Sequence, residues 1–208
     1  MLMWTGFRVF VLLVGVVLCA PAAAEKNELA IALGLRAGGE LEISSTGRSP
    51  DLDVTEATGL IYNRGLGPET FFTAFWSHQS TELSAPGEFS DGDSFEIDID
   101  YLHAGSVYRP VRDGAAQAYV QFTAGLTWYR AQRAGFGDEF GLSLAAGGGG
   151  QFRISERLAF RLEGRVYATL TSVSFGGRCV SGACTFAVSG SGALQFEGLG
   201  ALVLRFGS

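Results

Sequence analysis

His78 and Ser80 are the two residues whose types and spacing best fit nucleophilic chemistry. In an extended strand, side chains two positions apart point to the same side, so the imidazole of His78 could accept the hydroxyl proton of Ser80. Such a pair also needs a third group that orients the imidazole, and the surrounding segment 76–80 does not identify one. A polar strand end explains both residues equally well, so we predict no catalytic residue and keep this pair as an alternative.

Two further motifs invite a binding interpretation. The glycine run 147–150 lacks the Gly-Lys-Ser/Thr ending of a phosphate-binding loop and lies inside a predicted strand, where glycine makes room for bulky neighbours or permits a bend. Asp91-Gly92-Asp93, with Glu82 and Glu88 before it, could hold a hard cation or bridge to lipopolysaccharide through one, but Asp-Gly is also an ordinary turn sequence. We therefore predict no metal site and no cofactor.

The N-terminal residues have the pattern of a secretion signal. Arg8 precedes an apolar run of about ten residues that ends at Leu18, and Ala22-Ala23-Ala24 offers a small-residue cleavage site. The run is too short for a spanning helix, which needs roughly 20 residues. We predict that residues 1–24 are a cleaved signal peptide, that Cys19 leaves with them, and that residues 25–208 form one domain.

The predicted mature chain is acidic, because the loss of Arg8 changes its formal net charge from −6 to −7. An acidic chain without a basic patch argues against a nucleic-acid partner. Cys179 and Cys184 are the cysteines that remain, and in an exported chain we expect a local disulfide between them. A metal site would need further ligands nearby, and no histidine is close to them in sequence.

The strongest pattern in the chain is a two-residue alternation. Between residues 158 and 166, apolar side chains share one face while Arg161, Glu163 and Arg165 share the other. A barrel in a lipid bilayer turns its apolar face outward and its polar face into the lumen. With the secretion signal, the pattern predicts an all-β fold, an eight-stranded antiparallel up-and-down transmembrane β-barrel. The predicted strands lie near residues 28–38, 53–63, 70–80, 95–101, 117–128, 139–154, 157–167 and 193–206, and the faces of 53–63 cannot be assigned.

The connections between these strands alternate in length. The long ones are 39–52, 81–92, 131–138 and 174–190. An even-stranded barrel with tight periplasmic turns and longer outer loops produces this alternation when both termini are periplasmic. We therefore expect the four long connections at the cell surface.

The polar faces predict what fills the lumen. Eight strands enclose a space just wide enough for side chains, so the polar face must pack against itself. If every apolar face points outward, five acids meet five arginines in a closed, charge-paired plug, because an unpaired enclosed charge is strongly disfavoured. The predicted members are Glu96, Asp98, Asp100, Arg161, Glu163, Arg165, Glu197 and Arg205, together with Arg36 and Arg153.

The chain resembles the small eight-stranded outer-membrane barrels of Gram-negative bacteria, a group that includes OmpX-like and OmpW-like proteins and the membrane domain of OmpA. The segments 118–129, 147–167 and 202–206 carry the resemblance. It implies a location in the cell outer membrane and contact with outer-membrane lipid and lipopolysaccharide. It also implies insertion by the barrel assembly machinery, which recognises a terminal aromatic residue such as Phe206. We expect a monomer.

These features predict a non-catalytic barrel with a structural or surface-interaction role through its long outer loops. One alternative is a lipid A-modifying enzyme, since an outer-membrane lipid A deacylase also uses a His and a Ser at the spacing of His78 and Ser80. Another is a carrier of small hydrophobic molecules, as suggested for OmpW-like proteins, which would need an apolar lumen opening. A soluble lipocalin-like barrel is the rival at the level of the fold.

Overall fold

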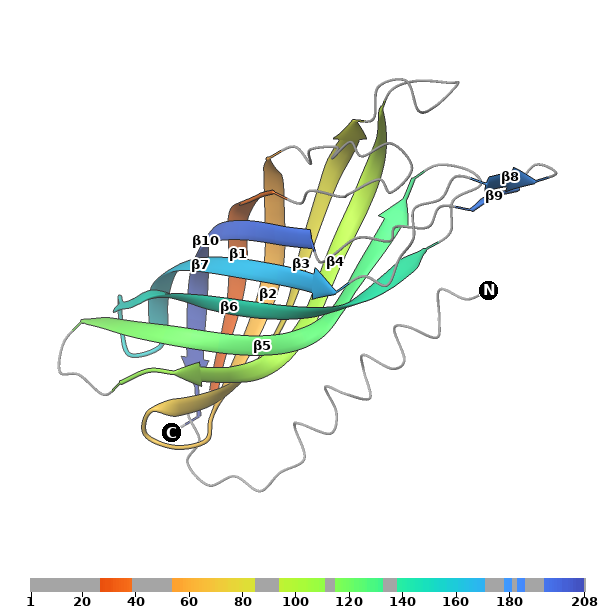
Figure 1. The fold of residues 1–208 in the computed structure, drawn as a ribbon. Helices are drawn as coiled ribbons and strands as arrows, with labels where there is room; N and C mark the ends of the chain where they lie inside the picture. Colours follow the sequence, from red (N-terminus) through yellow and green to blue (C-terminus); the bar gives the residue numbers. More distant parts are fainter. Residues whose placement is uncertain are drawn as a thin grey trace.

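The computed structural model describes residues 27–38, 54–84, 94–110, 115–132, 138–170, 178–180, 183–185 and 193–207. Eight strands close an antiparallel barrel in the order β1-β10-β7-β6-β5-β4-β3-β2 (Figure 1). They are β1 (Asn27–Ala37), β2 (Thr55–Gly65), β3 (Thr70–Ser84), β4 (Ser94–Tyr108), β5 (Ala116–Ala131), β6 (Glu139–Arg153), β7 (Leu158–Leu170) and β10 (Ala193–Phe206). The predicted eight-stranded up-and-down barrel is confirmed.

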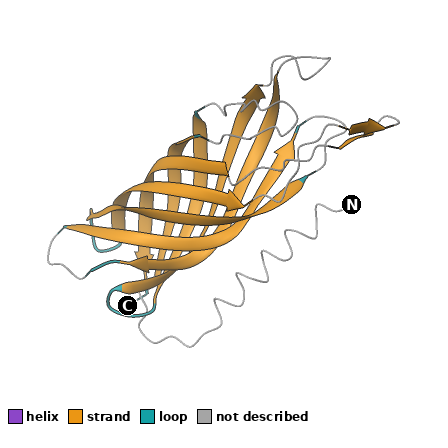
Figure 2. Ribbon diagram, in the orientation of Figure 1, coloured by secondary structure: helices purple, strands orange, loops and turns teal. Residues whose placement is uncertain are grey.

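The connection between β7 and β10 contains two further strands that the sequence did not predict. They are β8 (Arg178–Val180) and β9 (Ala183–Thr185), which pair with each other apart from the barrel sheet. No helix in the described residues is long and apolar enough to cross a membrane, and the described elements are all strands (Figure 2).

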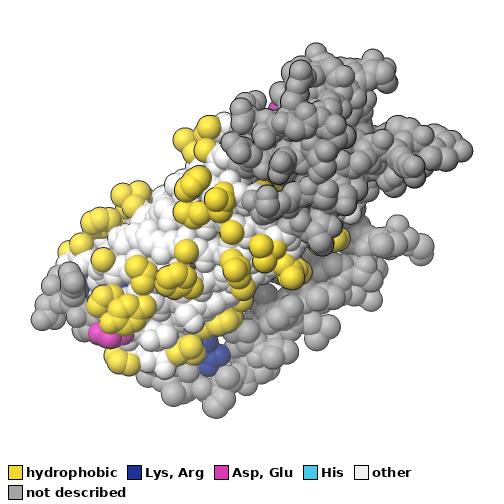
Figure 3. Space-filling view, in the orientation of Figure 1, with side chains coloured by type: hydrophobic (Ala, Val, Ile, Leu, Met, Phe, Trp, Pro, Cys, Tyr) yellow, Lys and Arg dark blue, Asp and Glu magenta, His cyan; other side chains and the backbone are white. Residues whose placement is uncertain are grey.

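The barrel wall turns its apolar side chains outward. On β1, Leu29, Ile31, Leu33 and Leu35 are exposed, while the residues between them are buried or partly buried. The same alternation holds on β5, β6, β7 and β10, as predicted, and on the face seen in Figure 3 apolar side chains are spread along the wall. A soluble barrel would not leave this much aliphatic surface exposed, so the exterior is suited to lipid.

The faces of β4 are the reverse of those predicted. Ile97, Ile99 and Tyr101 point into the lumen and are buried, while Glu96 is exposed on the outside. Inside, the ring of Tyr101 stacks on that of Tyr167 with centroids 4.2 Å apart. The lumen therefore contains an aromatic layer where the prediction placed acids, because these rings fill the width that the barrel encloses.

Glycines on β6 leave room for the backbone and the lumen side chains of the neighbouring strand β7. A Cβ atom on Gly149 would lie 1.9 Å from the carbonyl oxygen of Leu162, and one on Gly147 would lie 3.1 Å from Cγ of Arg165. The glycine run therefore makes room for neighbouring residues, which is the structural interpretation preferred above.

Candidate functional site

A buried carboxylate, Glu28 on β1, organises the lumen at the end where the chain termini of the barrel lie. Arg109 donates to both of its oxygens, at 2.8 and 2.9 Å, and Arg161 donates to Oε2 at 3.2 Å. Gln151 and Asn63 donate as well, at 3.0 and 3.2 Å. This bidentate, fully buried arrangement is the kind of pairing that makes an enclosed charge tolerable.

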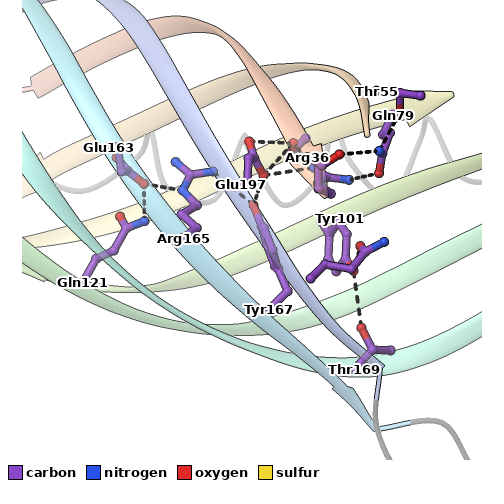
Figure 4. A network of polar contacts seen from close by, with 12 residues as sticks. Arg36, Thr55, Gln79, Tyr101, Gln121, Glu163, Arg165, Tyr167, Thr169 and Glu197 are labelled. Atoms are coloured by element: carbon purple, nitrogen blue, oxygen red, sulfur yellow. Dashed lines mark hydrogen bonds and ion pairs between the residues drawn. The ribbon is translucent and has the colours of Figure 1, made fainter. Parts of the chain in front are cut away.

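A second group of charges continues the network along the lumen. Glu163 accepts hydrogen bonds from Arg165, from Tyr119 at 2.5 Å and from Gln121 at 2.5 Å. Arg36 pairs with Glu197 at 3.0 Å, and Tyr167 donates to the same carboxylate at 2.5 Å (Figure 4). Arg165 also donates to the Tyr167 hydroxyl at 3.4 Å, which connects the two pairs.

The membership of this lumen network differs from the prediction. The structure places Arg161, Glu163, Arg165, Glu197 and Arg36 inside, but Glu96, Asp98 and Asp100 lie on the outer face of β4. Arg205 is partly exposed at the rim, 3.7 Å from Glu28, and Arg153 is exposed. The prediction missed Glu28 and Arg109. Four buried arginines, Arg36, Arg109, Arg161 and Arg165, therefore face three buried glutamates, Glu28, Glu163 and Glu197.

Glu28 could have been found from the sequence, because it shares the polar face of the first strand with Arg36. Arg109 could not, since its face is known only once β4 is assigned correctly. A polar cavity of about 30 Å³, lined in part by Gln117, Gln151 and Arg205, lies at this end of the lumen. This cavity has room for about one water molecule.

The acids of β4 belong to a second polar group on the outside of the barrel, which we call the outer polar cluster. The apolar exterior of this side ends at a row formed by Trp76 and its cross-strand partner Leu102. Along the two strands, toward the connection between β3 and β4, the next row pairs His78 with Asp100. The row after that pairs Ser80 with Asp98. The cluster consists of Trp76, His78, Ser80, Asp98, Asp100, Arg130 and Gln132, from β3, β4 and the end of β5. An indole beside charged groups at the edge of an apolar band is typical of the lipid headgroup level.

Asp100 is the orienting group that the sequence did not reveal. Its Oδ1 lies 3.0 Å from Nδ1 of His78 and accepts a hydrogen bond from Trp76 Nε1 at 2.9 Å, and its Oδ2 pairs with Arg130. An ionised carboxylate can only accept, so it places the imidazole proton on Nδ1 and leaves the lone pair on Nε2. That nitrogen lies 3.4 Å from Oγ of Ser80. A serine, a histidine and an aspartate thus stand in the order of a hydrolase triad.

Asp98 competes for the same serine. Ser80 donates to Oδ1 of Asp98 at 2.6 Å, and Gln132 donates to Oδ2 at 3.0 Å. Both carboxylate oxygens of Asp98 are therefore engaged, and Ser80 is held by one of them.

The two cysteines lie on β8 and β9. The register of this ladder places Cys179 directly opposite Cys184, while their side chains are outside the described residues. The Asp91-Gly92-Asp93 motif also lies outside the described residues, and within them no group of three or more histidines, cysteines and acids is arranged to hold a metal ion.

Solved structures of small outer-membrane barrels share the fold, including the two that follow. Neisserial surface protein A (NspA) is 11% identical, with 90% of this chain and 100% of that chain covered and a TM-score of 0.58. The outer membrane protein OprG from Pseudomonas aeruginosa is 12% identical, with 90% and 98% covered and a TM-score of 0.50. No protein-family model and no curated sequence matches the chain. The chain therefore has the closed eight-stranded barrel fold of small outer-membrane proteins, and at these identities the likeness concerns the fold alone.

Proposed function

We propose that the chain is a non-conducting barrel of the bacterial outer membrane that acts through its outer surface, in a structural or surface-interaction role. The charge pairs inside the lumen support this most directly, because Glu28 on β1 pairs with Arg161 on β7 and with Arg109, which follows β4, and neither strand is a neighbour of β1 in the barrel. A barrel closed in this way offers solutes no path, so its role falls to the surface and the outer loops.

Membrane insertion is tested by an alkaline carbonate wash of cell envelopes. The exposed aliphatic side chains of the wall predict that the protein stays with the outer-membrane fraction. Release into the supernatant, which a soluble lipocalin-like barrel would show, would contradict the proposal.

The surface role is tested by photo-crosslinking in intact cells. A crosslinking amino acid at Asp138, the last residue of the long connection 131–138, should capture lipopolysaccharide or another surface component. The same amino acid at Ile154, in a short turn at the opposite end, is the matched control and should not. Capture of lipopolysaccharide at Ile154 instead would overturn the proposed orientation.

A second candidate function, hydrolysis of a lipid ester, is favoured by one observation, the contact of Asp100 with His78 at 3.0 Å. In this reaction Nε2 of His78 accepts the Ser80 proton while Oγ attacks the ester carbonyl, and the proton then passes to the departing alcohol oxygen. Water, deprotonated by the same imidazole, releases the fatty acid and restores the serine. The position of the outer polar cluster at the edge of the apolar band suits an acyl chain that enters from the lipid.

The hydrolase candidate predicts that purified protein releases fatty acid from lipopolysaccharide and that Ser80→Ala abolishes the release. Ser106→Ala is the matched control, because Ser106 is also exposed on the outer face but lies near the opposite end of β4. Equal release, or equal absence of release, from wild type and Ser80→Ala would refute the candidate.

A further inference from the structure

We propose that Asp98 is a latch that keeps Ser80 from His78, and that a hydroxyl group of a lipid headgroup opens it by taking the place of Ser80 on the Asp98 carboxylate. The inference rests on the hydrolase candidate and concerns the regulation of that same site. It is drawn from the distances between the hydroxyl of Ser80 and its two possible acceptors, Asp98 and His78.

The hydroxyl of Ser80 has one proton and two acceptors within reach. The carboxylate oxygen of Asp98 is 2.6 Å from Oγ, whereas Nε2 of His78 is 3.4 Å away. Hydrogen bonds to an ionised acceptor are shorter and stronger than those to a neutral one. The proton therefore points to Asp98, and the imidazole cannot remove it from Ser80 in this arrangement.

The second carboxylate oxygen of Asp98 is held by Gln132, which follows β5, and lies near Arg130 on β5. Gln132 donates to Oδ2 of Asp98 at 3.0 Å, and Arg130, which pairs with Asp100, has NH2 3.9 Å from the same oxygen. Arg130 also lies over the Trp128 ring, with Cζ 4.8 Å from its centroid. Asp98 is thus held in place, so that release of Ser80 requires a new donor rather than movement of the carboxylate.

The position of the latch indicates the chemical class of that donor. Ser80 is exposed and Asp98 is partly exposed, on the outer face two rows beyond that of Trp76 and Leu102. A lipid beside this wall would bring the hydroxyls of its headgroup to this level. A sugar hydroxyl that donates to Asp98 leaves Ser80 free to donate to Nε2 of His78, so the nucleophile is activated only beside a hydroxylated lipid.

The test measures covalent labelling of purified full-length protein by an alkyl fluorophosphonate, which reacts with an activated serine. Without lipid, Asp98→Ala should label about tenfold faster than wild type, since it removes one charge-assisted hydrogen bond from the serine, and Asp98→Asn should be intermediate. Glu96→Ala is the matched control, because it removes an exposed carboxylate from the same face of β4, and should label like wild type. Ser80→Ala should not label.

The opening step is measured by adding lipopolysaccharide from which the ester-linked acyl chains have been removed, so that it has headgroup hydroxyls but no substrate ester. It should raise the labelling rate of wild type toward that of Asp98→Ala and leave the variant unchanged. Thermal melting by circular dichroism shows that each variant is folded.

The outcomes separate the latch from the hydrolase candidate. Equal labelling of wild type and Asp98→Ala, with no labelling of Ser80→Ala, would overturn the latch and leave the hydrolase standing. Slower labelling of Asp98→Ala would also overturn the latch, because Asp98 would then assist the serine. No labelling and no fatty-acid release by any folded variant would refute both.

Discussion

At the scale of single residues, we expect mutation of the buried lumen arginines to lower the stability of the barrel most. Arg161 is fully buried and donates to Glu28 at 3.2 Å and to Gln151 at 2.9 Å. Arg161→Ala removes one of the charges that compensate Glu28, so we expect the free energy of unfolding to fall by about 3–5 kcal/mol. Urea unfolding in lipid bilayers measures it.

The neighbouring residue is the control for this prediction. Leu162 points outward from the same strand and is half exposed, so lipid fills the space that Leu162→Ala leaves and the loss should be smaller. Equal losses for the two variants, or a larger loss for Leu162→Ala, would contradict the view that charge pairing inside the lumen holds the barrel together.

The sequence predicted a residue's position correctly where alternation along its strand shows which face the side chain occupies. Arg36, Arg161 and Glu197 lie on the polar faces of their predicted strands, and the structure places all three in the lumen. Contacts between strands could not be inferred in the same way. Asp100 orients His78 because the register of β3 and β4 sets them opposite each other, although they are 22 positions apart in the chain.

At the scale of elements, β4 shows why the alternation rule fails. The rule holds where the outside of the barrel is lipid, as it is for β6 and β7. Beyond the row of Trp76 and Leu102, the outward face of β4 carries Asp98 and Asp100, and its inward face carries rings that fill the lumen. Apolar and polar residues alternate on both sides of this boundary. On one side the apolar residues face outward, and on the other they face the lumen. The sequence does not mark where the boundary lies.

The ladder of β8 and β9 makes the expected disulfide a specific prediction. Cys179 and Cys184 are cross-strand partners in its register, so we expect them to be oxidised in protein isolated from the outer membrane. Their loss should destabilise this loop by about 2 kcal/mol on chain-entropy reasoning and leave the barrel folded.

Mass spectrometry of alkylated, unreduced protein tests the pairing. A peptide mass two hydrogens below that of the dithiol form, with no alkylation, is the expected result. Two alkylated thiols in the mature protein would contradict it, and unfolding of the barrel in a Cys179→Ser, Cys184→Ser variant would show that the ladder does more than hold its own loop.

At the scale of the whole molecule, the orientation of the barrel can be tested on intact cells. The structure extends β3 to Ser84 and β5 to Ala131, beyond the ends predicted from the sequence. Strand order and the alternation of connection lengths therefore predict that added protease cuts only within 39–52, 85–92, 132–138 and 174–190. Cleavage in the turn between β2 and β3, or at Ser155-Glu156, on intact cells would reverse the assignment of the two ends.

The central claim is that the lumen is closed by its own charges, and single-channel recording in planar lipid bilayers tests it most directly. Purified protein should show little stable conductance, because Glu28, Glu163 and Glu197 are each bound to arginines inside the lumen, and an eight-stranded barrel encloses a space that side chains can fill. Arg161→Ala should show more frequent openings than wild type. A large, reproducible single-channel current from the wild-type protein would contradict the closed barrel and favour transport.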